Sequence, residues 1–205
     1  MRTRIAACAA LLALQLTSAL AADPTQTAPA AAAGATEEVG AITTDLGSIV
    51  IRFFPDSAPI HVDNFKALAR SKFYDDTTFH RVAPGFVIQG GDPNSKDADP
   101  GNDGTGDGPR QLKAEFNSRP HVRGTVSMAR SNDPNSASCQ FFIVIGDARF
   151  LDGKYSLFGE VIEGMDTVDK IVAGAAPIDP GRQRPAKPVV MRKVRIETRP
   201  KAGTP

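Results

Sequence analysis

Residues 79–92 read FHRVAPGFVIQGGD and combine strand-forming apolar residues with a Pro-Gly turn, one arginine, one glutamine and two adjacent glycines. Ala83-Pro84-Gly85 lies where two segments rich in β-branched and aromatic residues meet, 77–82 and 85–90, and this arrangement favours a pair of strands. Arg81 has no carboxylate beside it in this run. Since a permanently charged group among apolar residues needs a partner, that partner must come from elsewhere in the chain or from a ligand.

Strand-like and helix-like segments follow along the rest of the chain. Two segments repeat apolar residues at helical spacing: 58–73, with Pro59 near its start, and 164–174, with Gly174 as a plausible C-cap. Many short strands with two helices predict a mainly β domain, a closed eight-stranded antiparallel barrel capped by the two α-helices. The six further predicted strands are 40–47, 48–55, 123–130, 139–146, 155–162 and 188–198.

The N-terminal sequence MRTRIAACAALLALQLTSALA has two arginines, an apolar stretch and a small-residue cleavage site. It predicts a secretory signal peptide over residues 1–21 and a periplasmic location, with full secretion as an alternative. A membrane anchor is the other interpretation, but the apolar stretch is short for a span. We expect a disordered Pro/Ala-rich linker over 22–37, one domain over 38–199 and a flexible tail over 200–205.

Charge and cysteine content exclude some classes of function. Removal of residues 1–21 leaves 22 basic and 23 acidic residues, a net charge of −1, which argues against a nucleic-acid-binding surface. Cys139 is then the one remaining cysteine, so it cannot form an internal disulfide. It is either a reactive thiol or a small buried residue, and its strand-like surroundings favour the second.

No metal or cofactor is expected. His61, His80 and His121 are scattered and match no zinc motif, and no nucleotide-binding loop is present. The acidic, glycine-rich segment 94–108 lacks the spacing of a calcium loop, so we interpret it as a functional surface loop. We interpret His80 as a hydrogen-bonded structural histidine rather than a catalytic base.

Two predicted strands each place an apolar residue and an amide on one face. Side chains alternate along a strand, so Val87 shares a face with Gln89, and Gln140 shares one with Phe142. With Arg81 from the preceding strand, these residues could form an apolar floor with a few convergent donors, as in a small ligand pocket. They could equally be ordinary core and rim residues, and periodicity alone leaves both interpretations open.

Longer motifs carry a resemblance to a known family. FHRVAPGFVIQGGD, GTG at 104–106, SMAR at 127–130, QFFI at 140–143 and FLDGKYSLFGEV at 150–161 resemble the cyclophilins, which are peptidyl-prolyl cis–trans isomerases. The resemblance spans roughly residues 38–198, and Phe150 with Tyr155 looks like the bacterial periplasmic branch. It implies the barrel with two helices, rotation of X-Pro bonds without a cofactor, and proline-containing segments of unfolded or folding polypeptides as partners of a monomer. A peptide-binding chaperone with little turnover is the alternative.

The resemblance also implies roles for individual residues. Arg81 would be the catalytic residue, and Val87 and Arg130 depart from the family by standing where many members have methionine and asparagine. Phe150 and Tyr155 stand where eukaryotic members have tryptophan and histidine. The implied substrate-binding residues are Phe86, Val87, Phe142 and Leu151 around the proline ring, Gln89 and Gln140 on the substrate backbone, Ala129 and Arg130 through main-chain groups, Gly104 on the neighbouring groove, and Phe150 and Tyr155 at the rim.

Overall fold

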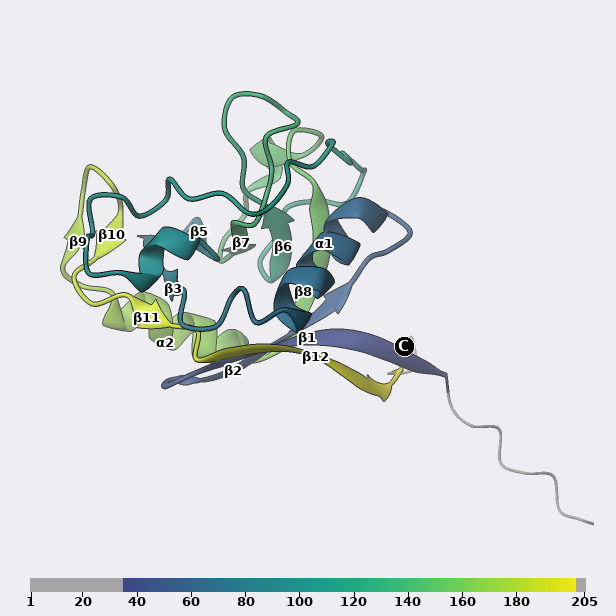
Figure 1. Ribbon diagram of the computed structural model, residues 1–205, viewed down its shortest axis with the longest axis horizontal. Helices are drawn as coiled ribbons and strands as arrows, with labels where there is room; N and C mark the ends of the chain where they lie inside the picture. The colour runs from purple at the N-terminus through teal and green to yellow at the C-terminus, as the bar shows by residue number, and fades with distance from the viewer. Residues whose placement is uncertain (1–34, 202–205) are drawn as a thin grey trace, which may run out of the picture. The chain divides into compact units, whose positions relative to one another are not determined.

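The computed structural model describes residues 35–201 (Figure 1). The predicted signal peptide and most of the predicted linker therefore lie outside the described residues. Strand β1 begins at Thr36, inside the last residues of the range expected for the linker, and Pro200 is the last residue of strand β12. Among the described residues, no helix has the length and apolar character needed to cross a membrane.

The described chain is mainly β, with two α-helices as predicted. Helix α1 (Pro59–Arg70) and helix α2 (Met165–Gly174) occupy the two segments with helical spacing. Short 3₁₀ turns at Pro93–Lys96 and Arg149–Leu151 complete the helical structure. The strands are β1 Thr36–Thr44, β2 Gly47–Phe53, β3 Thr78–Phe79, β4 Arg81–Ala83, β5 Val87–Gly90, β6 Thr125–Met128, β7 Phe141–Val144, β8 Leu157–Glu163, β9 Ile178–Asp179, β10 Arg184–Pro185, β11 Val189–Val190 and β12 Lys193–Pro200.

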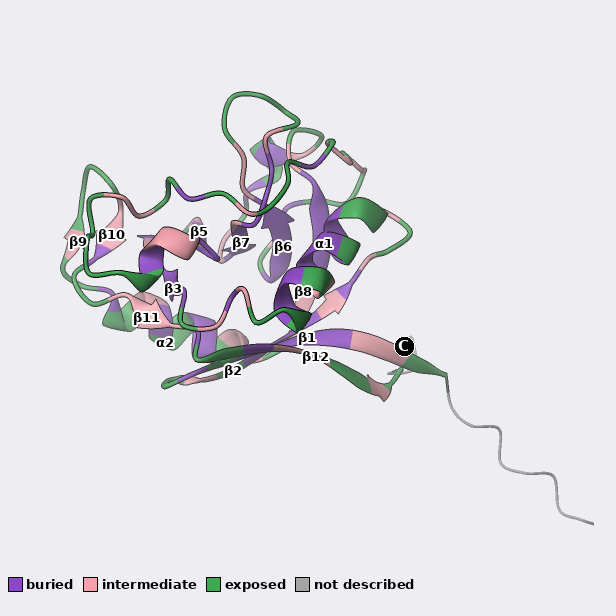
Figure 2. Cartoon of the chain, viewed as in Figure 1, coloured by how far each residue is buried: buried purple, intermediate pink, exposed green. Residues whose placement is uncertain are grey.

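Eight strands form one antiparallel sheet in the order β12-β1-β2-β8-β6-β7-β5-β4. Each of the eight predicted strand segments contributes one strand to it. Helix α1 packs on β12 and β8, and helix α2 packs on β2. Figure 2 shows that the central strands carry mostly buried residues, whereas the connecting loops are largely exposed.

The prediction of a closed barrel is wrong, because the sheet ends at β12 on one side and β4 on the other. Two predicted long strands, 77–82 and 188–198, are each broken in two, and the fragments β3 and β11 pair only with each other. Their register would next place His80 opposite Pro188, which has no N–H to continue the ladder. The outer edge of β4 instead bonds to the β9–β10 hairpin, where the Val82 N–H donates to the Gln183 carbonyl at 2.7 Å.

The inner face of the sheet and the two helices enclose the main hydrophobic core. Ile88, Phe141 and Ile143 point into it from β5 and β7, together with residues of α1 such as Phe65. Tyr74 is fully buried, and its hydroxyl donates to the carbonyl of Cys139 at 2.9 Å. Cys139 is itself buried and burial raises the pKa of its thiol to about 12, so its interpretation as a buried residue is confirmed.

The start of helix α1 is stabilised by a residue far away in the sequence. Its N-cap position, Ala58, has no side-chain acceptor. The carboxylate of Glu115 instead accepts hydrogen bonds from the backbone N–H groups of Ile60 and His61, both at 3.0 Å. A carboxylate at this position satisfies free N–H groups and complements the helix dipole. This contact also ties the long segment between β5 and β6 to the body of the domain.

Candidate active site

The outer face of the sheet carries a row of residues from four neighbouring strands. Arg81 on β4 lies directly opposite Gln89 on β5, which lies opposite Phe142 on β7, which lies opposite Ser127 on β6. Directly opposite residues share a face, so this row points away from the main core. Phe142 accordingly belongs to a second, separate hydrophobic cluster, whereas its neighbour Phe141 belongs to the main core.

This second cluster surrounds a cavity of about 200 Å³, which we call the apolar cavity. Its lining, apolar and aromatic side chains with a few convergent polar groups, resembles that of a small-ligand pocket. The apolar cavity is lined by Arg81, Phe86, Val87, Gln89, Ala129, Arg130, Phe142, Leu151 and Tyr155. All nine belong to the sequence-predicted site, so the structure brings most of that set together.

Aromatic contacts shape the walls of the apolar cavity. The rings of Phe142 and Tyr155 meet edge to face with centroids 5.6 Å apart, and the Arg130 guanidinium lies over Tyr155 at 4.6 Å from the ring centroid. Phe150 does not line the cavity. It is 62% exposed and packs on Phe86, with ring centroids 5.3 Å apart, so it lies at the rim.

A chain of amide hydrogen bonds fixes the orientation of Arg81. Its Nε donates to Gln183 Oε1 at 2.9 Å and its Nη1 to Gln89 Oε1 at 3.2 Å. Gln89 Nε2 donates to Gln140 Oε1 at 3.0 Å, and Gln140 Nε2 donates to the carbonyl of Gly106 at 2.9 Å. Arginine only donates and a carbonyl only accepts, so the two ends of this chain determine how both glutamine amides are turned.

Arg81 has no carboxylate partner within ion-pair distance in the described part of the chain. Both of its hydrogen-bond partners are neutral amides, and these occupy two of its five N–H groups. Burial lowers the pKa of the guanidinium from its usual value, but arginine stays charged at neutral pH. Arg81 is therefore a partly buried cation that lines a cavity with N–H groups still free.

A second cavity, about 350 Å³ in volume, adjoins the first and shares Gln89, Ala129 and Arg130 with it. We call it the polar cavity, because the loop 104–107 and the segment 129–140 line it mainly with polar groups. Gly104 and Gln140, which were predicted from the sequence, lie here rather than in the apolar cavity. Arg130 donates from Nε to the Lys154 carbonyl at 3.0 Å, which holds it between the two cavities.

A third cavity, of about 360 Å³, lies on the other side of Arg81 and Gln89. His80 contributes to its lining, together with the loop 100–105 and the β9–β10 hairpin. Burial lowers the pKa of His80 to about 4, an effect that Asp92 opposes and that Arg81 and Arg184 reinforce. Neither ring nitrogen of His80 has a partner at hydrogen-bond geometry among the described residues, so the predicted hydrogen bonding of this histidine is wrong. That His80 is structural rather than a catalytic base stays a prediction.

Sequence reasoning missed Gln183 and the support beneath Phe142. Gln183 contacts Arg81 across 102 sequence positions, and no local pattern marks it. His121 stacks below Phe142 with ring centroids 6.2 Å apart. Its Nδ1 lies 2.8 Å from Asp152 Oδ1 and its Nε2 lies 3.2 Å from Ser127 Oγ. Since Ser127 is fully buried, this trio supports the cavity floor and offers no accessible nucleophile.

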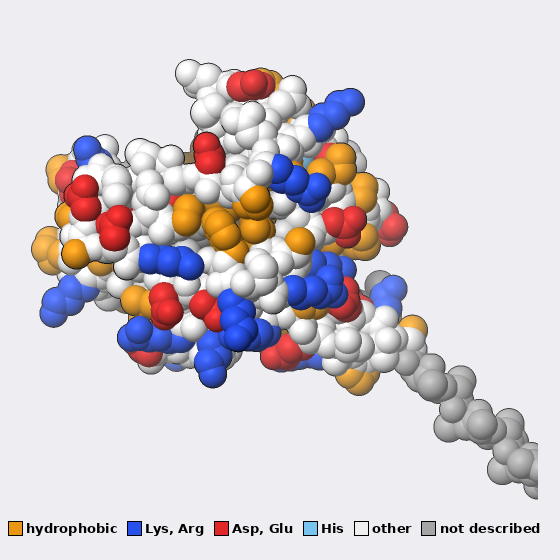
Figure 3. All heavy atoms as spheres, in the orientation of Figure 1, with side chains coloured by type: hydrophobic (Ala, Val, Ile, Leu, Met, Phe, Trp, Pro, Cys, Tyr) orange, Lys and Arg blue, Asp and Glu red, His pale blue; other side chains and the backbone are white. Residues whose placement is uncertain are grey.

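The described residues contain no group of three or more His, Cys, Asp or Glu side chains placed to hold a metal ion. The surface in Figure 3 has Lys and Arg side chains intermixed with Asp and Glu on the face that it draws.

Comparisons with known proteins agree with this geometry. A family model described as cyclophilin type peptidyl-prolyl cis-trans isomerase matches residues 39–196. A probable peptidyl-prolyl cis-trans isomerase of Brucella abortus is 42% identical over 158 residues, covering 75% of this chain and 80% of the relative. Peptidyl-prolyl cis-trans isomerase A of Dickeya dadantii is 38% identical over 165 residues, covering 76% and 82%.

Solved structures give the same result. A cyclophilin-type isomerase of Cryptosporidium parvum, crystallised in the presence of the dipeptide Ala-Pro, superposes with a TM-score of 0.69 at 30% identity. That match covers 78% of this chain and 98% of the other. A cyclophilin from Hirschia baltica gives a TM-score of 0.60 at 26% identity, covering 78% and 75%. The chain therefore belongs to the cyclophilin family and is a peptidyl-prolyl cis–trans isomerase.

Proposed function

We propose that the apolar cavity holds the proline ring of an X-Pro segment while Arg81 promotes rotation of the preceding peptide bond. The position of Arg81 carries this proposal: an unpaired cation, held by two amides, lines an apolar cavity of about 200 Å³. Phe86, Val87, Phe142 and Leu151 would contact the ring, and Tyr155 would close one side. The Ala-Pro dipeptide present in the Cryptosporidium parvum crystals supports a proline-containing ligand here.

The mechanism needs no covalent step. An X-Pro bond rotates slowly because amide resonance sets a barrier of about 18–20 kcal/mol. When the C–N bond twists, resonance is lost and the proline nitrogen regains a lone pair. A donor aimed at that nitrogen favours the twisted state over both planar states, which is differential stabilisation of the transition state. The free N–H groups of Arg81, which lines the cavity, can supply that donor.

The amide chain gives Arg81 its orientation before substrate binds. Gln183 and Gln89 hold Nε and Nη1, so the remaining N–H groups have a fixed direction and little reorganisation is needed during rotation. Gln89 and Gln140 lie where the two cavities meet, and we propose that they and the main chain at Ala129 and Arg130 hold the substrate backbone. Gly104 borders the polar cavity, and Phe150 would cover the outer rim beside Phe86.

We further propose that the protein acts in the periplasm on exported polypeptides, as a monomer, with residues 1–21 removed. The N-terminal sequence supports this proposal. A peptide-binding chaperone that uses the same cavities with little turnover is the rival function, and the preorganised Arg81 favours the enzyme.

Replacing Arg81 with alanine should lower kcat/KM for X-Pro peptides by roughly 10²–10³, the usual scale for one preorganised transition-state donor. The fold should persist, because Arg81 lies on the outer face of an edge strand. Exchange spectroscopy of a proline peptide measures the rate, and circular dichroism checks the fold. Arg123→Ala, which removes an exposed arginine paired with Asp169, is the matched control. An unchanged rate in folded Arg81→Ala would refute the assigned role.

Alanine substitutions at the adjacent Phe141 and Phe142 should differ in whether stability or catalysis is affected more. Phe141→Ala removes a main-core ring and should cost about 3–5 kcal/mol of stability, the usual cost for a buried phenylalanine. Phe142→Ala opens onto the apolar cavity, so we expect a smaller loss of stability and a greater loss of kcat/KM in the folded protein. Urea unfolding and peptide exchange measure the two effects. Full activity in Phe142→Ala would place the proline elsewhere.

Activity should be nearly constant between about pH 6 and 9, because arginine does not titrate there. His80, with its pKa at about 4, stays neutral over this range, and the Cys139 thiol, with its pKa at about 12, stays protonated. A fall in rate near the ordinary histidine pKa would instead indicate a catalytic base.

Stability should depend on pH through His80. Because burial depresses the pKa of His80, the unfolded chain takes up a proton at higher pH than the folded chain does. The free energy of unfolding should therefore fall as pH drops from about 6.5 towards 4.

Export should leave a mature N-terminus at Ala22 in the periplasmic fraction of an expressing Gram-negative bacterium. N-terminal sequencing of the fractionated protein tests this. An uncleaved chain in the membrane pellet would favour the anchor interpretation instead.

A further inference from the structure

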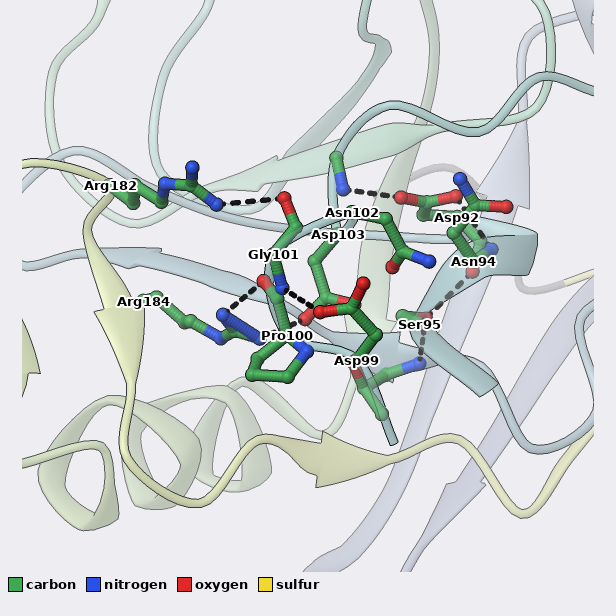
Figure 4. A network of polar contacts seen from close by, with 12 residues as sticks. Asp92, Asn94, Ser95, Asp99, Pro100, Gly101, Asn102, Asp103, Arg182 and Arg184 are labelled. Carbon is green, nitrogen blue, oxygen red and sulfur yellow. Dashed lines mark hydrogen bonds and ion pairs between the residues drawn. The ribbon is translucent and has the colours of Figure 1, made fainter. Parts of the chain in front are cut away.

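The third cavity contains three arginines and only one carboxylate. It is lined by Arg81, Arg182 and Arg184, with Asp103 paired to Arg184, and we call it the arginine cavity. It lies between the loop that follows β5 and the β9–β10 hairpin, two segments about 80 positions apart in the sequence (Figure 4). It shares Arg81 and Gln89 with the apolar cavity, so the two cavities meet at the residues assigned to rotation.

Hydrogen bonds hold the two hairpin arginines in place. Arg184 Nη2 lies 2.6 Å from Asp103 Oδ2, and its Nη1 donates to the Pro100 carbonyl. Arg182 Nη1 donates to the Gly101 carbonyl at 2.9 Å, which fixes the direction of the guanidinium (Figure 4). In the described residues Arg182 has no carboxylate partner, and its Nε and Nη2 have no acceptor. Its charge is therefore positioned but not neutralised.

His80 gives a second, independent sign that the cavity takes a ligand. The side chain lines the cavity and is only 5% exposed, yet neither ring nitrogen has a hydrogen-bond partner in the described chain. A side chain built on Gly104 would meet His80 Nε2 first, at 3.7 Å, so glycine leaves the edge of the ring uncovered. Buried polar groups without partners are rare, and such a group in a cavity wall marks a place where a ligand or water completes the bonding.

Asp103 is the one acid in the cavity lining, and the other nearby acids belong to the loop behind it. The Asp99 carboxylate accepts the Gly101 N–H at 2.8 Å, and the Asp92 carboxylate accepts the Asn94 N–H at 2.9 Å and the Gly104 N–H. Both carboxylates keep their negative charge: burial, together with the charges of Asp92, Asp97 and Asp99, raises the pKa of Asp103. None of these three neighbours lines the cavity itself. With three cationic side chains and one anionic side chain in the lining, the cavity favours an occupant with negative charge.

From this cavity we infer a substrate preference: the enzyme selects X-Pro segments that carry an aspartate or glutamate within about two residues of the proline. This inference rests on the proposed function of the apolar cavity. One residue of extended chain spans about 3.3–3.6 Å, so a neighbour of the bound proline can reach a cavity that shares Arg81. Its carboxylate would accept hydrogen bonds from the free N–H groups of Arg182, whose planar fork matches a carboxylate.

The test compares peptides that differ by one isosteric substitution. In four pairs of proline peptides, Glu or Gln occupies one of the two positions before the proline or one of the two positions after it. Exchange spectroscopy with the full chain gives kcat/KM for each peptide. At one position the Glu peptide should exceed its Gln partner by about 2- to 5-fold, the scale of an exposed ion pair. This ratio should fall towards one as salt rises from about 50 mM to about 1 M.

Variants connect the ratio to Arg182. Arg182→Gln should bring the Glu/Gln ratio to about one, Arg182→Glu should invert it, and Arg182→Lys should keep part of it. Arg70→Gln is the control, because this exposed arginine on α1 lines none of the three cavities. It should leave the ratio unchanged.

The outcomes separate the two proposals. The acidic preference would be overturned by equal kcat/KM for the Glu and Gln peptides at all four positions, or by an undiminished Glu advantage in Arg182→Gln. In either case, turnover of the peptides would still uphold the proposed function. Failure of the enzyme to act on any of the eight peptides would overturn the proposed function, and the preference with it.

Discussion

The alternation of side chains along β5 and β7 is the constraint on which the rest of this molecule depends. Within β7, Phe141 and Ile143 face the main core while Phe142 faces outward, and in β5 Ile88 and Gln89 divide in the same way. Because the period is two residues, a slip of one position would bury the site residues and expose the core. Burial of the inner face therefore also positions the outer face, and the stability of the core makes the site rigid.

The outward face then becomes a site because polar groups connect its strands. The hydrogen bonds from Gln183 through Arg81, Gln89 and Gln140 to the Gly106 carbonyl join the β9–β10 hairpin, β4, β5 and the loop before β6. Every amide in this chain has one orientation that satisfies its neighbours. The chain thus holds a guanidinium in a direction that its own flexible stem could not maintain, which reduces the reorganisation required during rotation of the substrate bond.

The open edge of the sheet explains why the hairpin reaches the site at all. In a ladder closed from β4 to β12, the outer edge of β4 would be paired with another strand. Here β4 is three residues long, and no strand of the sheet pairs with its outer edge. The Val82 N–H on that edge donates instead to the Gln183 carbonyl of the β9–β10 hairpin. Gln183 itself has a left-handed backbone, with φ of 53°, which turns its side chain back to Arg81 while its carbonyl bonds to Val82. The same hairpin brings Arg182 and Arg184 to the loop that follows β5.

The sequence by itself determined the local structure and most of the site. Period-two and helical patterns located all eight sheet segments and both helices, and the motifs around Arg81, Gln89 and Phe142 identified a set of residues that the structure largely brings together. The tertiary structure decided the open edge of the sheet, the capping of α1 by Glu115, the contact of Gln183 with Arg81 and the exposed position of Phe150. These features depend on residues brought together from distant parts of the chain, such as Gln183 with Arg81 or Glu115 with the start of α1. A local pattern records which face a side chain takes, but not which distant backbone group will meet it.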